Sequence, residues 1–447
     1  MNRNEEYQAL LQELEATPPA LDGTAERALR RRRRERRLRL FGVPAGSLVA
    51  CFIAFVLLVN LFPPFARACG NVPVLRALAQ AVACSPSLSA AVENDYVQPI
   101  GQSQTENGIT ATIEYVIVDQ KQVHIFFTLK GEGDESLSAE MPEFTPRQHC
   151  SVLGADFRQE PGTLLHFTLD YQDNDVPEGF TMAFGVTGET GTENGPAAPT
   201  RSILDEPERE EPDILASFTF DLDFDPTYTA QGEIVPVDST FQLDGQTLTV
   251  TEAEVYPTHV RVNVEGAADN TAWLKDLDFC LENEDGERFD SISNGVSATG
   301  DPDTPAMKSF RLESPYFADS THLTLHITGA TWLDKNRERV RADLKNGTVE
   351  WLPEGVTVQA IQHRENGWML TFDVTAPADI HKQVFASRYY DEAGTKYDMD
   401  NFGWSVLDDG HGEAYLPLRD YDQETVLLEL NWSHTTQAEV PVTIPIK

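Results

Sequence analysis

The stretch NGITATIEYVIVDQKQVHIFFTL, residues 107–129, decides the fold that the sequence predicts. Apolar and polar side chains alternate from Thr110 to Val118 and again from Val123 to Leu129, with a polar turn between the two runs. Alternation with a period of two is typical of a β-strand that buries one face. Two such runs joined by a short polar turn predict an antiparallel β-hairpin.

The same pattern occurs twice more along the chain. DGQTLTVTEAEVYPTHVRVNV fills residues 244–264 and EGVTVQAIQHRENGWMLTFDV fills residues 354–374, and each opens with a polar residue and glycine. The last two copies also share a later hairpin, with Gly286 and Gly394 in its turn. Short strands repeated at this spacing indicate a mainly β fold of tandem antiparallel immunoglobulin-like β-sandwiches. We expect three of them, at residues 94–226, 234–345 and 347–447.

A different kind of segment precedes the strands, where an arginine run is followed by the apolar residues 40–65. No charged side chain interrupts Leu40 to Phe62. At about 1.5 Å of rise per residue, Ala45 to Phe62 alone would cover about the thickness of a bilayer's hydrocarbon core, so we predict one transmembrane helix. A cleaved signal peptide would also place positive charge before an apolar run. Against it, this segment begins only after 39 residues and is longer than a usual signal core.

The arginines set the orientation of the predicted helix. Arginine is retained on the cytoplasmic side, so residues 1–39 should form a cytoplasmic tail, and the chain after the span should be extracellular, in a single-pass protein of the cell membrane. So basic a run could instead contact nucleic acid, but its position beside an apolar span favours a role in setting the membrane topology. The topogenic residues are Arg30, Arg31, Arg32, Arg33, Arg34, Arg36, Arg37 and Arg39.

Charge differs between the two sides of the predicted span. Residues 1–66 hold ten arginines, no lysine and seven acidic residues, which gives a net charge of +3. The whole chain carries −38, so the remainder is near −41. Such a surface repels nucleic acid and acidic polymers, and we expect no nucleic-acid partner. Five cysteines are too few for a disulfide scaffold, and their spacing matches no zinc site.

The tail contains one amphipathic pattern. Tyr7, Leu10, Leu11 and Leu14 fall at i, i+3, i+4 and i+7, which predicts a short helix with a single apolar stripe. So short a helix is marginal in water unless a partner covers the stripe. We expect these residues to bind in a groove of a cytoplasmic protein. A disordered tail with incidental leucines is the alternative.

Residues 66–93 are expected to hold a helix just outside the bilayer. VPVLRALAQAVA (72–83) has Pro73 in its first turn, and its apolar face could rest on membrane lipid or on the first sandwich. That face consists of Leu75, Leu78, Ala79 and Val82. Cys69 and Cys84 flank the helix. A disulfide between them is disfavoured, because the helix ends are about 16 Å apart and bridged Cα atoms lie within about 7 Å.

The order of these segments resembles the family called domain of unknown function 4179. The likeness rests on the arginine-rich tail, the span, the VPVL helix, NDYVQPIGQSQTENGITATIEYVIVDQKQVHIFFTL (94–129) and SFTFDLDF (217–224), and it covers roughly residues 40–225. Members are bacterial single-pass membrane proteins, often followed by immunoglobulin-like domains, and many are encoded beside extracytoplasmic-function sigma factors. The resemblance implies a layout like that of membrane anti-sigma factors, with a sigma factor as the partner of the tail. It defines no functional residues.

We expect no enzyme activity, cofactor or metal. The sequence contains no G-x-S-x-G elbow, no H-E-x-x-H and no glycine-rich phosphate loop. His149 and Cys150 are adjacent on a predicted strand, so their side chains point to opposite faces. Two acidic sets match no EF-hand spacing, and alternation puts the second on a solvated strand face. They are Asp170, Asp173, Asp175 and Glu178, and Asp221, Asp223 and Asp225.

Three functions from different classes remain compatible with the sequence. The favoured one is a transmembrane regulator whose outer modules sense an envelope state and whose tail restrains a transcription factor. The second is an envelope-binding or adhesion protein whose sandwiches bind a wall component or a protein. The third is a hydrolase built on sandwich loops.

Overall fold

The structure is a computed structural model that describes residues 73–447 except 132–136, 156–163, 189–212, 227–228, 293–294, 301–303, 319, 376–382, 400–401 and 407–410. The predicted tail with Tyr7, Leu10, Leu11, Leu14 and its arginines, the span at 40–65 and Cys69 lie outside the described residues. No helix among the residues that the structure does describe is long and apolar enough to cross a membrane. The chain divides into two units, Met1–Pro73 and Val74–Lys447, and all the strands belong to the second.

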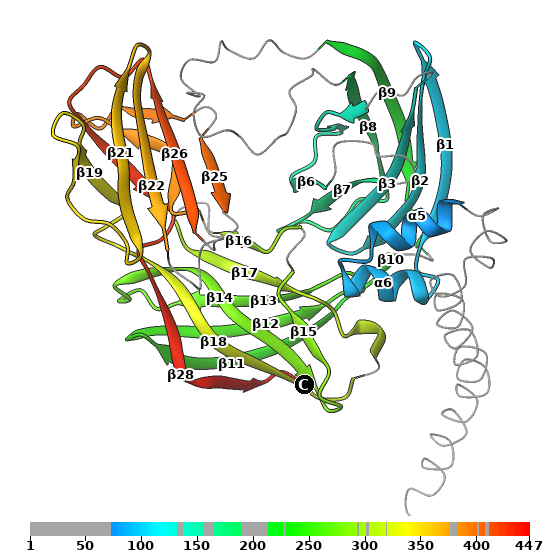
Figure 1. The fold of residues 1–447 in the computed structure, drawn as a ribbon. Coiled ribbons are helices and arrows are strands. Elements are labelled where there is room, and N and C mark those ends of the chain that lie inside the picture. Colours follow the sequence, from blue (N-terminus) through cyan, green and yellow to red (C-terminus); the bar gives the residue numbers. More distant parts are fainter. Residues whose placement is uncertain are drawn as a thin grey trace, which may run out of the picture. The chain divides into compact units, whose positions relative to one another are not determined.

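The hairpin predicted from residues 107–129 is confirmed. Strand β2 (Ile109–Asp119) pairs with β3 (Gln122–Lys130), and β1 (Gln98–Glu106) precedes them (Figure 1). Asn107 and Gly108 have φ values of 51° and 79°. Asn-Gly is the pair that best tolerates positive φ at both central residues of a two-residue hairpin loop, which explains the turn between β1 and β2.

The first sandwich consists of two sheets over one core. The first sheet runs β1-β2-β3-β7-β6 with β10 beside β2, and the second runs β4-β8-β5 with β9 beside β8. Their core is rich in phenylalanine, including Phe127, Phe167 and Phe184. The remaining strands are β4 (Leu137–Ala139), β5 (Glu143–Thr145), β6 (Ser151–Ala155), β7 (Leu165–Asp170), β8 (Gly179–Gly188), β9 (Ile214–Asp223) and β10 (Thr229–Ala230).

One edge of the first sandwich is closed by side chains. Gln98 donates from Nε2 to the Asp223 carbonyl (2.9 Å) and accepts at Oε1 from the Asp225 amide (3.0 Å). Gln104 makes the same two contacts with the backbone of Thr219. A glutamine amide offers one donor group and one acceptor group, as a backbone amide does, so these side chains cover the outer edge of β9.

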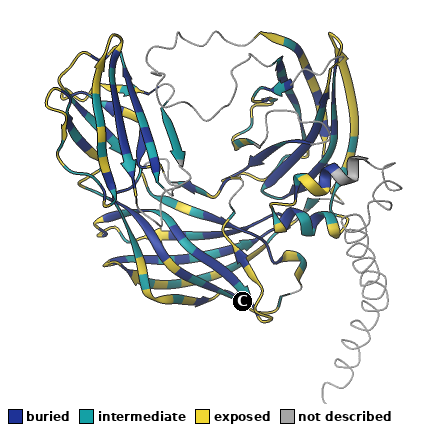
Figure 2. Cartoon of the chain, viewed as in Figure 1, coloured by how far each residue is buried: buried dark blue, intermediate teal, exposed yellow. Residues whose placement is uncertain are grey.

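The second sandwich pairs one five-stranded and one four-stranded sheet. Their orders are β11-β12-β13-β17-β16 and β15-β14-β18-β28. The central strands are buried along most of their length (Figure 2), and Trp332 is fully buried between the sheets. The strands are β11 (Glu233–Leu243), β12 (Gln246–Val255), β13 (Val260–Gly266), β14 (Ala272–Asn283), β15 (Arg288–Asp290), β16 (Ala298–Gly300), β17 (Met307–Leu312), β18 (Leu323–Asp334) and β28 (His434–Pro445), with a 3₁₀ turn η4 (Tyr316–Ala318).

The third sandwich has the sheets β20-β19-β27-β23-β24 and β21-β22-β26-β25. Its core contains Phe372, Phe385 and Trp432. The hairpins predicted around Gly286 and Gly394 are both present, as β14–β15 and β23–β24. The strands are β19 (Arg339–Asp343), β20 (Thr348–Val349), β21 (Val356–Arg364), β22 (Gly367–Val374), β23 (Phe385–Tyr390), β24 (Lys396–Asp398), β25 (Gly403–Val406), β26 (Gly412–Arg419) and β27 (Thr425–Leu430).

The strand pairing departs from the expected boundaries 234–345 and 347–447 in two places. Strand β19 pairs with β27 and places Val340 in the third core, not the second. The last strand, β28, returns to the second sandwich, where it lies beside β18 (Figure 1) and buries Ile444. Alternation shows that a segment is a strand but not which sheet it joins. The repeat alone therefore could not show that β19 belongs to the third sandwich and β28 to the second.

Two helices stand where one was expected in residues 66–93. They are α5 (Pro73–Ala81), which confirms the VPVL helix, and α6 (Pro86–Glu93), which was not predicted. Ser85 caps α6 by accepting from the Leu88 amide at 3.3 Å, and Pro86 occupies its first turn. On α5, Ala77 and Leu78 are buried, whereas Ala79, assigned to the apolar face, is exposed.

Candidate functional site

Among the described residues, a set of buried polar side chains joins the first sandwich to the second. We call this set the polar interface. The first sandwich contributes Asp119, Gln122, His124, His166, Thr168 and Asp170, and the second contributes Thr258, His259, Arg261, Thr299 and Arg311. All are buried except His166, which is half-buried.

Asp170, the last residue of β7, is the anionic centre of the polar interface. Its Oδ1 accepts from Arg311 NH2 at 2.8 Å and from Arg261 NH2 at 3.2 Å. Its Oδ2 accepts from Gln122 Nε2 at 2.6 Å and from Arg311 Nε at 3.3 Å. Burial alone would raise the pKa of this carboxyl, but Arg311 and Arg261 outweigh burial and lower the pKa to about 2. Asp170 is therefore ionised at neutral pH.

The two arginines depend on Asp170 for their position. Arg261 on β13 and Arg311 on β17 are directly opposite each other in the antiparallel pair. Like charges in that relation repel, so the strand pair on its own is unfavourable at this point. A carboxylate from the first sandwich lies against both guanidinium groups and offsets the repulsion. The second sandwich thus carries two neighbouring positive charges, Arg261 and Arg311, whose repulsion is offset by Asp170 of the first sandwich.

Asp119 makes the second link between the sandwiches. Its Oδ1 accepts from the backbone amides of Lys121 and Gln122, both at 2.8 Å, and so shapes the β2–β3 turn. Its Oδ2 accepts from Thr258 through the hydroxyl (2.5 Å) and the amide (3.2 Å). Burial alone would raise the pKa of Asp119, but its hydrogen bonds with His259, Thr258 and the Lys121 amide act against burial, and the pKa lies well below the usual value.

Three histidines complete the polar interface. His259 accepts at Nε2 from Arg261 Nε (2.9 Å), and its Nδ1 lies 3.0 Å from Thr258 Oγ1. His124 Nδ1 lies 3.1 Å from His166 Nε2. Burial is the main cause that lowers the pKa of each ring, to about 4 for His124, so all three are neutral at pH 7.

The helix pair is attached to the same region. Leu78 and Leu88 pack with Ile117 and Phe126 on the face of the first sheet that is turned away from its core, together with Phe317 of η4. Glu313, just after β17, accepts from the Ser87 amide at 2.8 Å and also from the Ser87 hydroxyl. Burial raises the pKa of Glu313. The start of α6 is therefore held by the second sandwich, while its apolar face lies on the first.

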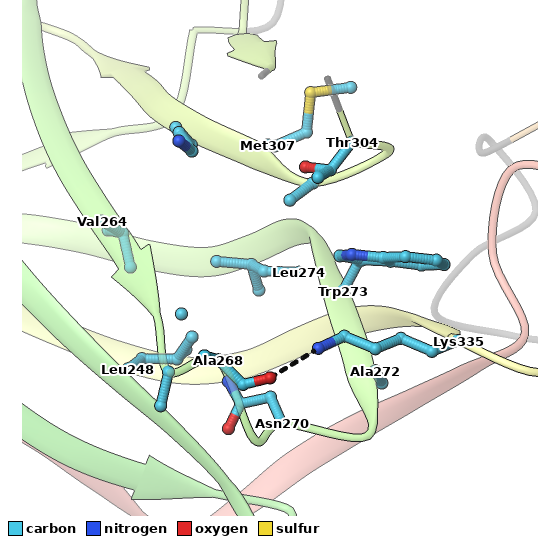
Figure 3. A pocket seen from close by; sticks show the side chains of 14 residues that line it. Leu248, Val264, Ala268, Asn270, Ala272, Trp273, Leu274, Thr304, Met307 and Lys335 are labelled. Atoms are coloured by element: carbon cyan, nitrogen blue, oxygen red, sulfur yellow. Dashed lines mark hydrogen bonds between the residues drawn. The ribbon is translucent and has the colours of Figure 1, made fainter. Parts of the chain in front are cut away.

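A separate cavity of about 230 Å³ opens at one end of the second sandwich. Figure 3 shows Leu248, Val264 and Leu274 along it, with Trp273 and Lys335 close to each other. Lys335 Nζ lies 5.9 Å from the Trp273 ring centroid and donates to the Ala268 carbonyl at 3.3 Å. The cavity thus offers apolar walls, an aromatic face and one cation.

The acids singled out in the sequence do not gather into a metal site. Within the described part of the chain, no group of three or more histidine, cysteine, aspartate or glutamate side chains could hold a metal ion. Asp221, Asp223 and Asp225 are exposed, as expected for a solvated face. Asp175 is paired with Lys121 at 2.9 Å. His149 is exposed, and Cys150 packs against the first core.

Sequence reasoning missed the polar interface because its members are far apart in the chain. A usable signal was present at β3, β7 and β13, where strands in a predicted sandwich carry histidine or arginine among apolar neighbours, as in VHIFFTL and HVRVNV. Such strands are buried on both faces. A half-exposed strand would place those polar residues in water.

The fold and the polar interface define a multi-sandwich β protein whose first two modules are joined by buried charges. The resemblance to domain of unknown function 4179 is confirmed for residues 36–131, which match Domain of unknown function (DUF4179), and this match ends before residues 217–224. Residues 232–358 match Family of unknown function (DUF5643). No curated protein is significantly similar in sequence. A solved structure, the conserved domain protein from Bacillus anthracis, is similar at 12% identity with a TM-score of 0.38, over 57% of this chain and 85% of that chain.

Proposed function

We propose that this protein is a single-pass membrane regulator of anti-sigma-factor-like layout. Its immunoglobulin-like modules lie outside the cell, and its cytoplasmic tail binds a transcription factor, namely an extracytoplasmic-function sigma factor. In this proposal the protein catalyses no reaction and needs no cofactor. The membrane span and the orientation follow from residues 40–65 and the arginines before them.

The observation that carries the proposal is the attachment of α6 to two modules at once. Its N-terminus is bound by Glu313 of the second sandwich, and its buried residues Leu88 and Ala91 lie against the first. A plain anchor needs only a flexible connection between the span and the outer domains. A helix shared by two modules moves or loosens when they separate, so it suits a protein that transmits an outer event along the chain.

The partner of the tail can be tested in the full-length chain. Detergent-solubilised protein is captured from cells that also produce the candidate sigma factor. We expect the wild-type chain to retain the sigma factor, and the variant with Leu10→Asp and Leu14→Asp to lose it, because charge on the apolar stripe prevents helix-in-groove binding. Gln8→Asp and Gln12→Asp add the same charge beside the stripe and serve as the matched control. Equal retention by both variants would contradict the proposal.

The cavity in the second sandwich favours a second candidate function, the binding of an envelope component. Its volume and its apolar wall suit a small apolar group, and Trp273 with Lys335 suits a sugar ring or an attached anionic group. In this reading the tail is only topogenic. Soluble wall fragments titrated into the full-length chain should bind to the wild type. Trp273→Ala should lower the affinity, whereas Trp404→Ala in the third sandwich should leave it unchanged. Unchanged affinity in Trp273→Ala would remove this candidate.

A further inference from the structure

We propose that the polar interface is a proton sensor, in which acid outside the membrane charges its histidines and separates the first sandwich from the second. The opening is a property of the two sandwiches, whereas its use as a signal rests on the proposed function. The stimulus that the outer part of the regulator would detect is a fall in pH.

The surroundings of His259 leave no place for a second proton. Arg261 Nε–H donates to Nε2 at 2.9 Å, so this nitrogen must be an acceptor and the proton of the neutral ring is on Nδ1. Nδ1 faces Thr258 Oγ1 at 3.0 Å and Asp119 Oδ2 at 3.5 Å. Protonation of Nε2 would set its N–H against the Arg261 donor. His259 can become cationic only if this contact breaks.

His124 and His166 restrict each other in the same way. The facing nitrogens, His124 Nδ1 and His166 Nε2, are 3.1 Å apart, so one must donate and the other accept. His124 Nε2 lies 3.1 Å from the side-chain oxygen Oε1 of Gln122 and is therefore a donor, which makes His124 Nδ1 the acceptor. With His166 in this tautomer, a further proton on His124 would set two N–H groups against each other and place a positive ring beside the neutral ring of His166. This arrangement therefore holds only while His124 is neutral.

The fixed charges around the histidines are already balanced. Asp119 and Asp170 together carry as much charge as Arg261 and Arg311, and every one of these four side chains is buried. An added proton therefore leaves a net positive charge in the polar interface. Asp119 and Asp170 favour the cationic form of His259, but burial outweighs them and lowers its pKa. The titratable and charged groups that face it from the packed elements are Asp119 on β2, Lys121 and Asp175 at the turns, His124 on β3, His166 and Asp170 on β7, Glu254 on β12, Tyr256 after it, His259 and Arg261 at β13, Arg311 on β17 and Glu313 after it.

The sign of the pH effect follows from the direction of the pKa shifts. A histidine whose pKa is lower in the joined state favours that state at pH values above its free pKa. This contribution is lost progressively as pH falls from the free pKa through the lowered pKa. For His124, with a pKa of about 4 when joined and an ordinary value of 6.5, the joined state loses about tenfold in equilibrium constant at pH 5.5. His166 and His259 shift in the same direction. Glu313, whose pKa is raised, acts with the opposite sign.

Hydrogen exchange on the full-length chain in nanodiscs tests the inference. Exchange is measured at pH 7.5 and pH 5.5 for peptides from β3, β7 and β13, and peptides from β21 and β22 of the third sandwich serve as the internal reference for the intrinsic pH effect. We expect protection of the polar interface to fall at least tenfold relative to the reference at pH 5.5, and protection around α6 to fall with it.

Variants separate histidine titration from general acid sensitivity. His124→Gln and His259→Gln should each weaken the pH dependence, and together they should remove most of it. His149→Gln, an exposed histidine of the first sandwich, should leave it unchanged. Unfolding by a substitution would show as lost protection already at pH 7.5, and the half-buried His166 gives the milder variant for that case. Equal protection at both pH values in the wild type, or full pH dependence in the double variant, would overturn the inference.

The outcome is independent of the partner assay. Acid opening without sigma-factor binding by the tail would support the sensor and contradict the proposed function. Binding by the tail with no acid opening would do the reverse.

Discussion

Replacing Asp170 by asparagine should separate the first sandwich from the second at neutral pH. The carboxylate accepts four hydrogen bonds, two of them from Arg311. Asparagine keeps the shape, but its one carbonyl oxygen cannot serve all four donors, and its NH₂ group would face a guanidinium donor. Arg261 and Arg311 would then be buried, opposite each other and uncompensated.

Two routes give the size of the effect. Lowering the pKa of Asp170 from 3.8 to about 2 corresponds to about 2.5 kcal/mol of preference for the charged form. Removing one partner from a buried ion pair costs about 3–5 kcal/mol. We therefore expect the free energy of opening the polar interface to fall by about 3 kcal/mol or more in Asp170→Asn.

Native-state hydrogen exchange of peptides from β7 and β17 in the full-length chain measures this free energy. Asp175→Asn is the matched control, because Asp175 lies five residues away and its own side chain is exposed, so the loss of its pair with Lys121 should cost less than about 1 kcal/mol. Asp170→Asn combined with Arg311→Met should recover part of the loss, since one of the unpaired charges is removed. Equal effects of Asp170→Asn and Asp175→Asn would refute the reasoning about buried charge.

Three further predictions concern other contacts. Glu313→Ala should lower the free energy of opening of α6, read from hydrogen exchange, by about 1–3 kcal/mol, because the Ser87 amide loses its acceptor, whereas the exposed Glu178→Ala should have no such effect. Ile444→Ala should destabilise β18 by about 2–4 kcal/mol and leave β22 unchanged, as judged by exchange; loss confined to the third sandwich would contradict the pairing of β28. Between pH 4 and pH 2 the stabilisation by Asp170 should disappear as pH falls, because its pKa is lowered to about 2, and Asp170→Asn followed by circular dichroism should show a smaller change over that range.

The local elements were predictable because their signals are contained in short stretches of sequence. Alternation identified the β2–β3 hairpin, and Pro73 with Leu78 identified α5. Helix α6 was missed because PSLSAAVE carries few apolar residues at helical spacing. Its stability comes from the Ser85 cap, Glu313 and packing on Ile117, which are partly tertiary contacts.

The sequence by itself determined the strand class, the repeat and the segments that predict a membrane topology, since periodicity and composition act along the chain. Only the tertiary structure decided that β28 completes the second sandwich and that Asp170 lies against Arg261 and Arg311. Those residues are 91 and 141 positions from Asp170. The sequence does not show that a carboxylate in an acidic stretch pairs with an arginine on an apolar strand. Folding removes both charges from water, and burial then requires them to pair.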